Sequence, residues 1–412
     1  MNKQKFEEVF GVKPIYEITT PSRVNLIGEH VDYFDGFSMP VAIENIKMTA
    51  LMSPRDDQEI WLYSTTDDKN GLIKIDTKSP RNQHQWIQYV QGAVEQFKKV
   101  AGNNLLGFNM MIDSSIPVGG GLSSSSALTM NSLIACGLTN GFFIDNQIVD
   151  IEKAIHLVNG KTDAAKPLLK TLALAGCSAE WWYGTKGGAM DHFAITVSKQ
   201  NYATLLDNLD FTYRYVEIPT DLTIVVCNTM VRHNQLYSGY AERKADAYAG
   251  FEKIKSYLPK SENSIRNLTI ETLLKYENKM SSRQFRRLTH PVTENIRVFA
   301  FKKALEEKNY SLAGQILNDA FVSLRDNYDV SCEELNIMQE AAVKSPGCFG
   351  ARITGGGFGG CIVALVNKSK VNEFMKSVKK LYDSDKKIQK ENIKAEVWEI
   401  KSSNGIKIHK FK

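Results

Sequence analysis

The sequence has 412 residues, of which 43% are hydrophobic and 24% charged, a composition typical of a soluble globular protein with two domains. Its 51 basic and 46 acidic residues leave a net charge of +5 that is spread along most of the chain, so nucleic-acid binding is not indicated. The N-terminus has no apolar signal region, and no stretch approaches the ~18 apolar residues of a membrane span, so we expect a cytoplasmic protein without membrane association.

A crowded polar stretch follows the first predicted strand, which begins near residue 14. Arg23, Glu29, His30 and Asp32 lie within ten residues of one another and beside glycines. A packed strand would not hold so many charged groups, so the stretch is either a solvated loop or a polar pocket. Such a pocket would suit a hydroxyl-rich ligand, because its carboxylates accept hydrogen bonds and the imidazole donates or accepts one.

Short strands are predicted at residues 48–52 and 60–64, and a helix at residues 86–97. The aromatic residues of this helix are typical of a core. Trp86 is also a candidate wall for an adenine base, which needs flat apolar surfaces on both sides.

A glycine- and serine-rich loop at residues 117–127 connects a predicted strand at 108–113 to a predicted helix at 127–136. Glycines let the main chain approach a phosphate, the helix N-terminus offers free N–H groups, and hydroxyls reach phosphate oxygens or a metal. We expect Gly120 to adopt a positive φ. The loop is not a Walker A sequence, because no Gly-Lys-Ser/Thr closes it, and a flexible capped turn is the alternative. The phosphate-binding candidates are Gly119, Gly120, Gly121, Leu122, Ser123, Ser124, Ser125 and Ser126.

A helical region at residues 148–180 leads to a glycine-rich turn and then to Asp191. An acidic residue there could accept a proton or hold a substrate hydroxyl, but Asp191 is equally consistent with a helix N-cap. Strands are predicted at 193–197, 211–218 and 222–227, with a domain change near Leu205. The expected domains are therefore residues 1–205 and 206–412.

Helices dominate the second half up to residue 342, and five glycines then lie between two apolar strands within residues 352–365. The glycines permit either a tight turn or a close approach to another loop or a ligand. Residues 371–381 are predicted to form an amphipathic helix whose lysines face solvent.

Three stretches together resemble the motifs of the GHMP small-molecule kinases, and the first resembles the galactokinase signature. They are Arg-Val-Asn-Leu-Ile-Gly-Glu-His-Val-Asp-Tyr at 23–33, Pro-Val-Gly-Gly-Gly-Leu-Ser-Ser-Ser at 117–125 and Thr-Gly-Gly-Gly-Phe-Gly-Gly-Cys at 354–361. Residues 326–335 resemble galactokinases as well. The resemblance implies an α+β GHMP kinase fold, with an N-terminal domain like ribosomal protein S5, a ferredoxin-like C-terminal domain and the active site between them.

The resemblance also implies a reaction, the ATP-dependent phosphorylation of the C1 hydroxyl of galactose. It assigns Asp191 and Arg23 to catalysis, and Arg23, Glu29, His30, Asp32, Gly188, Asp191 and Tyr240 to the sugar. ATP would be bound by residues 119–126, with Trp86 near adenine, and Mg²⁺ by Ser124, Ser125 and Glu180. The implied partners are the sugar and ATP alone, for a monomer or weak dimer.

Departures from the family pattern leave the substrate open. His192 follows Asp191 where galactokinases usually have Gln, and residues 184–188 resemble N-acetylgalactosamine kinases and plant galactokinases. Gly187 and Gly188 would leave room for an acetamido group, so N-acetylgalactosamine is the alternative substrate. A non-catalytic galactose sensor is disfavoured, because such proteins have a shortened serine segment. Whether Asp191 removes a proton or orients the hydroxyl also stays open.

Overall fold

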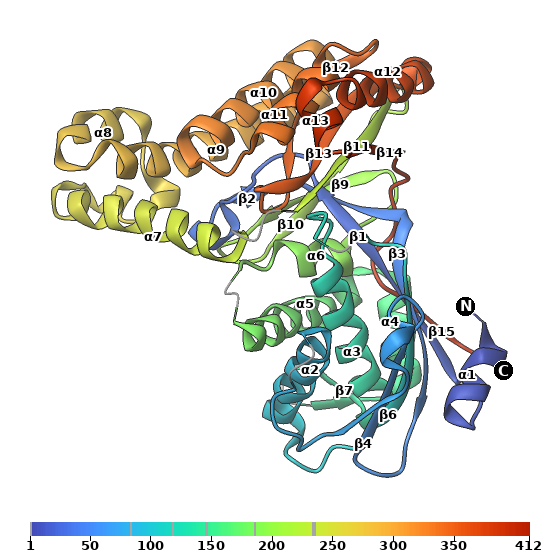
Figure 1. Ribbon diagram of the computed structural model, residues 1–412. Coiled ribbons are helices and arrows are strands. Elements are labelled where there is room, and N and C mark those ends of the chain that lie inside the picture. The colour runs from blue at the N-terminus through green and yellow to red at the C-terminus, as the bar shows by residue number, and fades with distance from the viewer. Residues whose placement is uncertain (1, 83–84, 118, 145–146, 185–186, 233–235) are drawn as a thin grey trace.

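The structure is a computed structural model that describes residues 2–82, 85–117, 119–144, 147–184, 187–232 and 236–412. It has two lobes built on separate sheets (Figure 1). The larger hydrophobic core fills the first lobe and continues between the lobes, and a second core lies within the second lobe. The mixture of helices and largely antiparallel sheets confirms the predicted α+β class. The described helices include none that is long and apolar enough to cross a membrane.

The first lobe is built on a six-stranded sheet with the order β15-β1-β3-β6-β4-β5. Its last strand comes from the C-terminus and pairs with β1, so the two ends of the chain lie close together (Figure 1). The strands are β1 (Tyr16–Asn25), β3 (Pro40–Pro54), β4 (Glu59–Ser64), β5 (Ile73–Asp76), β6 (Phe108–Ser114) and β15 (Lys407–Lys410). The strands predicted near residues 48–52, 60–64 and 108–113 are therefore confirmed.

Two smaller sheets complete this lobe. One has the order β10-β9-β2, and the other pairs β7 with β8. Leu205, where we predicted the domain change, lies within β9. The strands are β2 (Phe37–Ser38), β7 (Phe142–Ile144), β8 (Gln147–Val149), β9 (Tyr202–Asp207) and β10 (Tyr213–Glu217).

Helices cover both faces of the six-stranded sheet. Residues in β3 alternate between the faces, so Ala50 and Met52 join the main core while Leu51 packs with α1. The helix α1 (Lys3–Phe10) lies on the second face. The main core is covered by α2 (Gln85–Ala101), α3 (Ser124–Asn140), α4 (Ile151–Gly160), α5 (Lys166–Glu180) and α6 (Met190–Val197).

The strand predicted at residues 193–197 is wrong, because these residues form the second half of α6. All residues from His192 to Val197 are buried, so this part of the helix has no exposed face that would set a helical period of polar residues. Phe193, Ile195 and Val197 then alternate in a run of the length of a strand, and such a run cannot be told from a buried helix.

The second lobe is built on a four-stranded sheet with the order β12-β13-β11-β14. Its helices include α12, whose Val371, Phe374 and Val378 are buried as the amphipathic pattern predicted. The strands are β11 (Leu222–Arg232), β12 (Cys348–Thr354), β13 (Gly359–Asn367) and β14 (Glu396–Glu399). The helices are α7 (Leu236–Ile254), α8 (Ile270–Lys275), α9 (Ser282–Glu306), α10 (Tyr310–Val322), α11 (Glu333–Val343), α12 (Val371–Asp383) and α13 (Lys386–Lys390).

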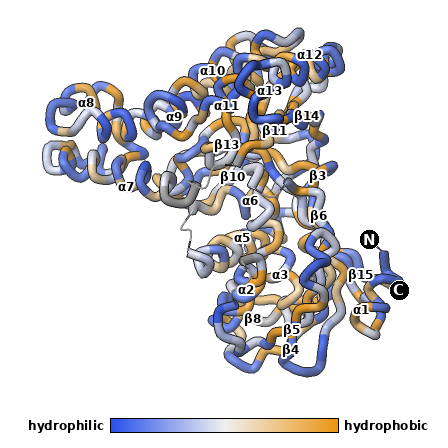
Figure 2. Tube along the Cα trace, in the orientation of Figure 1, coloured by the Kyte–Doolittle hydropathy of each residue, from blue (hydrophilic) through white to orange (hydrophobic). Residues whose placement is uncertain are grey.

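Hydropathy follows this arrangement. Figure 2 shows apolar residues gathered along the central strands, such as β13, whereas outer helices such as α8 mix hydrophilic and apolar residues. The polar exceptions inside the molecule therefore stand out, and several of them lie where the two lobes meet.

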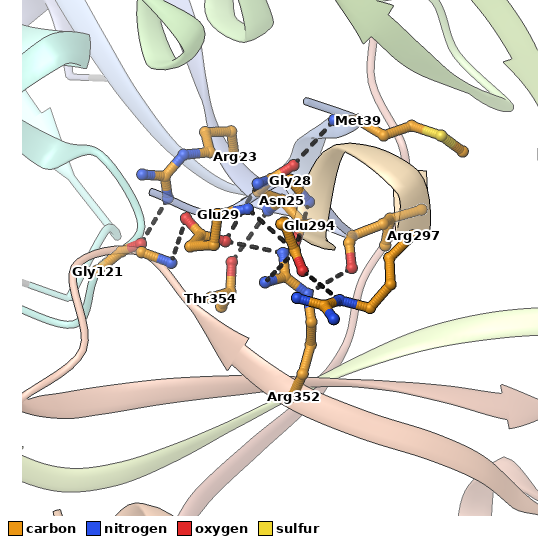
Figure 3. Close-up of polar contacts among 12 residues, drawn as sticks. Arg23, Asn25, Gly28, Glu29, Met39, Gly121, Glu294, Arg297, Arg352 and Thr354 are labelled. Carbon is orange, nitrogen blue, oxygen red and sulfur yellow. Dashed lines mark hydrogen bonds and ion pairs between the residues drawn. The ribbon is translucent and has the colours of Figure 1, made fainter. Parts of the chain in front are cut away.

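One such exception is a buried ion cluster of Glu29, Glu294, Arg297 and Arg352 (Figure 3). Arg352 on β12 is fully buried, and its Nη2 donates to Glu29 Oε2 at 2.8 Å and to the Asn25 carbonyl at 2.8 Å. Its Nε donates to the Leu26 carbonyl at 2.6 Å. An arginine of the second lobe thus holds the loop that follows β1 in the first.

Glu294 on α9 also binds the loop that follows β1. Its Oε1 accepts the Gly28 amide at 2.9 Å, and its Oε2 accepts Arg297 Nε at 2.7 Å. Burial would raise the pKa of the Glu294 carboxyl, but the nearby cationic groups, Arg297 first, lower it to about 2. Glu294 therefore stays ionised, and the cluster holds charges of both signs out of water.

Replacing Arg352 with methionine should lower the free energy of unfolding by ~3–5 kcal/mol, the cost of leaving a buried charge without its partner. Denaturant titration measures the change. The control is Lys344→Met, which removes a surface pair with Glu340 whose side chains are both more than 60% exposed. It should change the free energy by less than ~1 kcal/mol. Equal effects of the two substitutions would contradict the role given to the cluster.

Candidate active site

A cavity of about 1050 Å³ lies between the lobes and is lined by residues of both. Of the site residues predicted from the sequence, all but Gly120 line it. They come from β1, the loop after it, the glycine-serine loop, the turn before α6, and the helices α2, α3, α5, α6 and α7. The volume is in the range of ligand-binding pockets and is large enough for two small molecules side by side.

The centre of the cavity holds a two-pronged ion pair between Arg23 and Asp191. Arg23 Nε donates to Asp191 Oδ1 at 2.6 Å, and Nη2 donates to Oδ2 at 2.8 Å. Ser123 Oγ adds a third hydrogen bond to Oδ2, at 2.5 Å. Asp191 lies in the first turn of α6, whose N-cap is Ala189, and its carboxylate faces these donors. The helix-cap interpretation of Asp191 is therefore wrong.

The position of Arg23 follows an irregularity in the pairing of β1. The pairing of β1 with β3 shifts register between Pro21 and Ser22, where a proline lacks the N–H that a regular ladder needs. Arg23 is 4% exposed, and its Nη1 donates to the Gly121 carbonyl at 2.5 Å. Burial disfavours its charge, but Asp191 and Glu29 outweigh burial and raise the pKa of Arg23. Arg23 therefore joins the acidic residue to the glycine-serine loop.

The glycine-serine loop runs into the N-terminus of α3, which begins at Ser124. Positive φ angles occur at Gly119, Gly121 and Ser123, at 73°, 74° and 64°. The positive φ expected at Gly120 is wrong, and a Cβ there would lie 3.2 Å from the Cβ of Pro117. The described part of the loop excludes Val118. The residues in the left-handed conformation turn the main chain just before the free N–H groups at the start of α3. The main chain of the loop can therefore approach an anion closely.

Glu180, at the end of α5, contacts the start of α3 at the wall of the cavity. Its Oε2 accepts Ser126 Oγ at 2.8 Å and lies 2.9 Å from His192 Nε2. Burial would raise the pKa of Glu180, but His192 and the loop hydroxyls outweigh it and lower the value. The histidine that replaces the usual glutamine at position 192 thus has a local reason, because its ring lies against the Glu180 carboxylate.

The oxygens around Glu180 fit Mg²⁺, which prefers hard oxygen ligands and usually takes one or two carboxylates with phosphates and water. Ser124 and Ser125 line the same part of the cavity. Within the described ranges, no group of three or more His, Cys, Asp or Glu could hold a metal. A nucleotide would therefore have to supply several of the ligands.

The residues expected to hold the sugar also line the cavity, namely Glu29, His30, Asp32, Gly188 and Tyr240. Both oxygens of Glu29 are engaged, Oε1 by the Gly355 amide at 3.0 Å and Oε2 by Arg352. Burial, with Asp191 and Glu29 nearby, raises the pKa of Asp32 to about 7.

Glycine at position 188 is explained by close packing against Asp32. A Cβ on Gly188 would lie 2.2 Å from Asp32 Oδ2, so the space above this glycine is already filled. The expectation that Gly188 leaves room for a substituent is wrong for this reason. A Cβ on Gly187 would meet only the Tyr240 hydroxyl, at 3.8 Å. Thr185 and Lys186 of the same turn lie outside the described residues.

The far end of the cavity has aromatic walls. Trp86 lines it and donates through Nε1 to Asp67 Oδ2 at 3.2 Å. Tyr89 and Tyr183 stack with ring centroids 4.5 Å apart. Trp86 also packs against the main core, as the core interpretation predicted, while its contact with adenine stays a prediction.

Several residues that build the site were not predicted from the sequence. Thr354 Oγ1 accepts the Asn25 amide at 3.0 Å, and Arg352 fixes Glu29. The sequence did offer one signal for Arg352, because it is a charged residue inside the otherwise apolar strand Cys348–Thr354. The hydrogen bond from Ser123 to Asp191 joins residues that are 68 positions apart, so no local sequence pattern could predict it.

Family models match three parts of the chain. Residues 4–54 match the galactokinase galactose-binding signature, residues 88–166 the N-terminal domain of GHMP kinases, and residues 301–384 the C-terminal part of GHMP kinases. Together these matches contain all three motifs, whereas Asp191 and the glycine-rich turn before it lie outside the matched ranges.

Relatives and solved structures agree with these matches. A galactokinase of Clostridium perfringens is 35% identical over 385 residues, covering 92% of this chain and 93% of that protein. One from Chloroflexus aggregans is 34% identical and covers 90% of this chain and 88% of its own length. The Lactococcus lactis galactokinase in complex with galactose aligns with a TM-score of 0.84 and 29% identity, covering 99% and 98% of the two chains.

More distant structures share the fold alone. The Methanococcus jannaschii mevalonate kinase aligns with a TM-score of 0.60 and 19% identity, covering 94% of this chain and 98% of its own. The matched signature, the two GHMP kinase domains and the long alignments to relatives lead to one conclusion: the chain belongs to the galactokinase family of the GHMP kinases.

Proposed function

We propose that this chain transfers the γ-phosphoryl group of ATP to the C1 hydroxyl of galactose and so forms galactose 1-phosphate. The observation that carries the proposal is the contact of Asp191 with both Arg23 and Ser123. These contacts bring an acidic residue for a sugar hydroxyl to the edge of a loop suited to phosphates. Membership of the galactokinase family supports the same reaction.

Phosphoryl transfer requires positioning and charge stabilisation more than covalent chemistry. Asp191 accepts a hydrogen bond from the C1 hydroxyl, aims it at the phosphorus and is the nearest group to receive its proton. Arg23 lies within hydrogen-bonding distance of both Asp191 and the loop, so its charge stabilises the negative oxygens between them.

The glycine-serine loop holds the nucleotide. The phosphates lie against the main chain of residues 119–126 and the N-terminus of α3. Trp86 and the neighbouring aromatic residues form the base pocket. Glu180, Ser124 and Ser125 would hold Mg²⁺, which supplies positive charge to the phosphate oxygens when bound.

The sugar lies between Asp191 and the signature loop. Glu29, His30, Asp32 and Tyr240 face its other hydroxyls, and Asp32 fills the space above Gly188. The filled space at Gly188 favours galactose over a sugar with a bulky 2-substituent, while the space beside Gly187 is left open. We further propose a cytoplasmic enzyme that works as a monomer or weak dimer.

A coupled ADP-release assay over galactose, N-acetylgalactosamine, galactosamine, glucose and arabinose tests the substrate. We expect kcat/KM for galactose to be at least equal to that for N-acetylgalactosamine. A preference for N-acetylgalactosamine above ~10-fold, which is ~1.4 kcal/mol in transition-state binding, would overturn the galactose assignment.

Replacing Asp191 with asparagine should lower kcat at least ~10²-fold while ATP binding survives, because the shape stays and the carboxylate is lost. The control is Asp207→Asn, which breaks an equally two-pronged pair with Arg266 outside the cavity. It should keep most of the wild-type kcat. If the Asp191 variant kept more than about half of the wild-type activity, the role given to Asp191 would be wrong.

Replacing Gly121 with alanine should weaken ATP binding at least ~10-fold, because the loss of a left-handed glycine distorts the phosphate loop. Its Cβ would lie 3.1 Å from the Thr354 carbonyl, at a φ of 74°. Gly102→Ala is the control, since Gly102 has a φ of 79° and faces open space. Calorimetry should detect weaker ATP binding only in the Gly121 variant. Unchanged affinity there would move the phosphate site elsewhere.

A further inference from the structure

Trp181 is a large aromatic side chain at the cavity that is only partly covered by the protein. It begins η4 (Trp181–Tyr183), the turn that follows Glu180 at the end of α5, and it lines the cavity. The residue is 43% exposed and belongs to none of the hydrophobic cores formed by the described residues. Packing in a core therefore does not account for its position.

The indole N–H of Trp181 closes the glycine-rich turn that precedes α6. Its Nε1 donates to the Gly187 carbonyl at 2.9 Å, and the Trp181 carbonyl accepts the Gly184 amide at 3.0 Å. Cys177 on α5 adds a weaker contact, with its Sγ 3.9 Å from the Gly187 oxygen. Trp181 thus holds the turn at both Gly184 and Gly187, where glycine gives the main chain little stiffness of its own.

The bound carbonyl of Gly187 also sets the direction of the next amide. Because the peptide bond between Gly187 and Gly188 is planar and trans, the Gly188 N–H points away from the side on which Trp181 and Cys177 bind the oxygen. Gly188 lines the cavity and packs against Asp32. Among the described residues its N–H has no hydrogen-bond acceptor, so this donor is left for a ligand.

We propose that Trp181 is a positioning residue for the substrate, whose indole N–H fixes the Gly187–Gly188 peptide so that the Gly188 N–H is offered to a ligand oxygen. The inference rests on the proposed function in one respect, since that oxygen would belong to a hydroxyl of the sugar. The hydrogen bond from Trp181 to Gly187 is a property of the unliganded protein.

The expected effect is on sugar binding more than on phosphoryl transfer. Ordering a glycine-rich turn costs conformational entropy, and a turn that is already held does not bear this cost when the sugar binds. Asp191 keeps its own hydrogen bonds to Arg23 and Ser123 whether or not Trp181 holds the turn. Loss of the indole N–H should therefore raise KM for the sugar and leave kcat nearly unchanged.

Trp181→Phe removes the N–H and keeps an aromatic ring, and NMR on the unliganded full chain tests its effect on the turn. Glycine labelled with ¹³C at the carbonyl and ¹⁵N at the amide confines an HNCO spectrum to Gly-Gly pairs, and Gly187→Ala identifies the Gly187–Gly188 signal. We expect the Gly187 carbonyl signal to move upfield in Trp181→Phe, because its hydrogen bond is lost. A carbonyl signal that stays in place would overturn the proposal.

The same labelled glycines test the role given to the Gly188 N–H. Saturating galactose should shift the Gly188 amide signal of the wild-type chain. An amide signal that galactose leaves in place, in a chain that phosphorylates galactose, would overturn the assignment of this N–H to a ligand oxygen.

Steady-state kinetics test the consequence for the substrate. In Trp181→Phe we expect KM for galactose to rise ~2–10-fold, the scale of one net hydrogen bond, with kcat within ~2-fold of the wild type and KM for ATP unchanged. The matched control is Trp61→Phe on β4, which removes an indole N–H bonded to Glu59 Oε2 at the same 2.9 Å outside the cavity. It should change none of the three parameters. An unchanged KM for galactose in Trp181→Phe, or a fall in kcat alone, would overturn the positioning role.

The two proposals fail separately in these experiments. A wild-type chain that releases no ADP with galactose would contradict the proposed function, while the Gly187 signal still reports on the hydrogen bond from Trp181 without turnover. A chain that phosphorylates galactose, and whose Trp181→Phe variant keeps both the Gly187 signal and KM, would overturn the inference and leave the proposed function standing.

Discussion

A buried arginine links the two halves of this protein through charge, in addition to the hydrophobic core that they share. Arg352 donates to the carbonyls of Asn25 and Leu26 and to the Glu29 carboxylate, while Glu294 accepts the Gly28 amide (Figure 3). A buried charge without its partner is costly, so neither lobe can leave the other without exposing or orphaning charge. The signature loop is therefore shaped as much by the second lobe as by its own sequence.

The geometry of the site depends on this buried ion cluster. With Glu29 fixed, the short path back to Arg23 places the guanidinium between Asp191 and the Gly121 carbonyl. One arginine then touches the group proposed to hold the sugar hydroxyl and the loop proposed to hold the phosphates. Such preorganisation is what phosphoryl transfer needs, because donors already in place cost no reorganisation during the reaction.

The sequence predicted the motifs of the site better than it predicted their surroundings. Arg23, Asp191 and the serine loop stand in local patterns whose chemistry can be recognised, and the cavity brings them together. The structure of α6 was misjudged because full burial removes the helical period. Contacts such as Arg352 with Glu29, or Asp32 above Gly188, depend on the packing of distant segments and have no local signal.

Native-state hydrogen exchange on the unliganded protein tests most directly whether the signature loop is built before any ligand arrives. The informative amides are Gly28, which donates to Glu294, and Gly355, which donates to Glu29. If the buried cluster holds the loop, both should exchange only through global unfolding, as slowly as amides in the centre of β13. Exchange of Gly28 through local opening, at a rate near that of an exposed turn, would contradict this account.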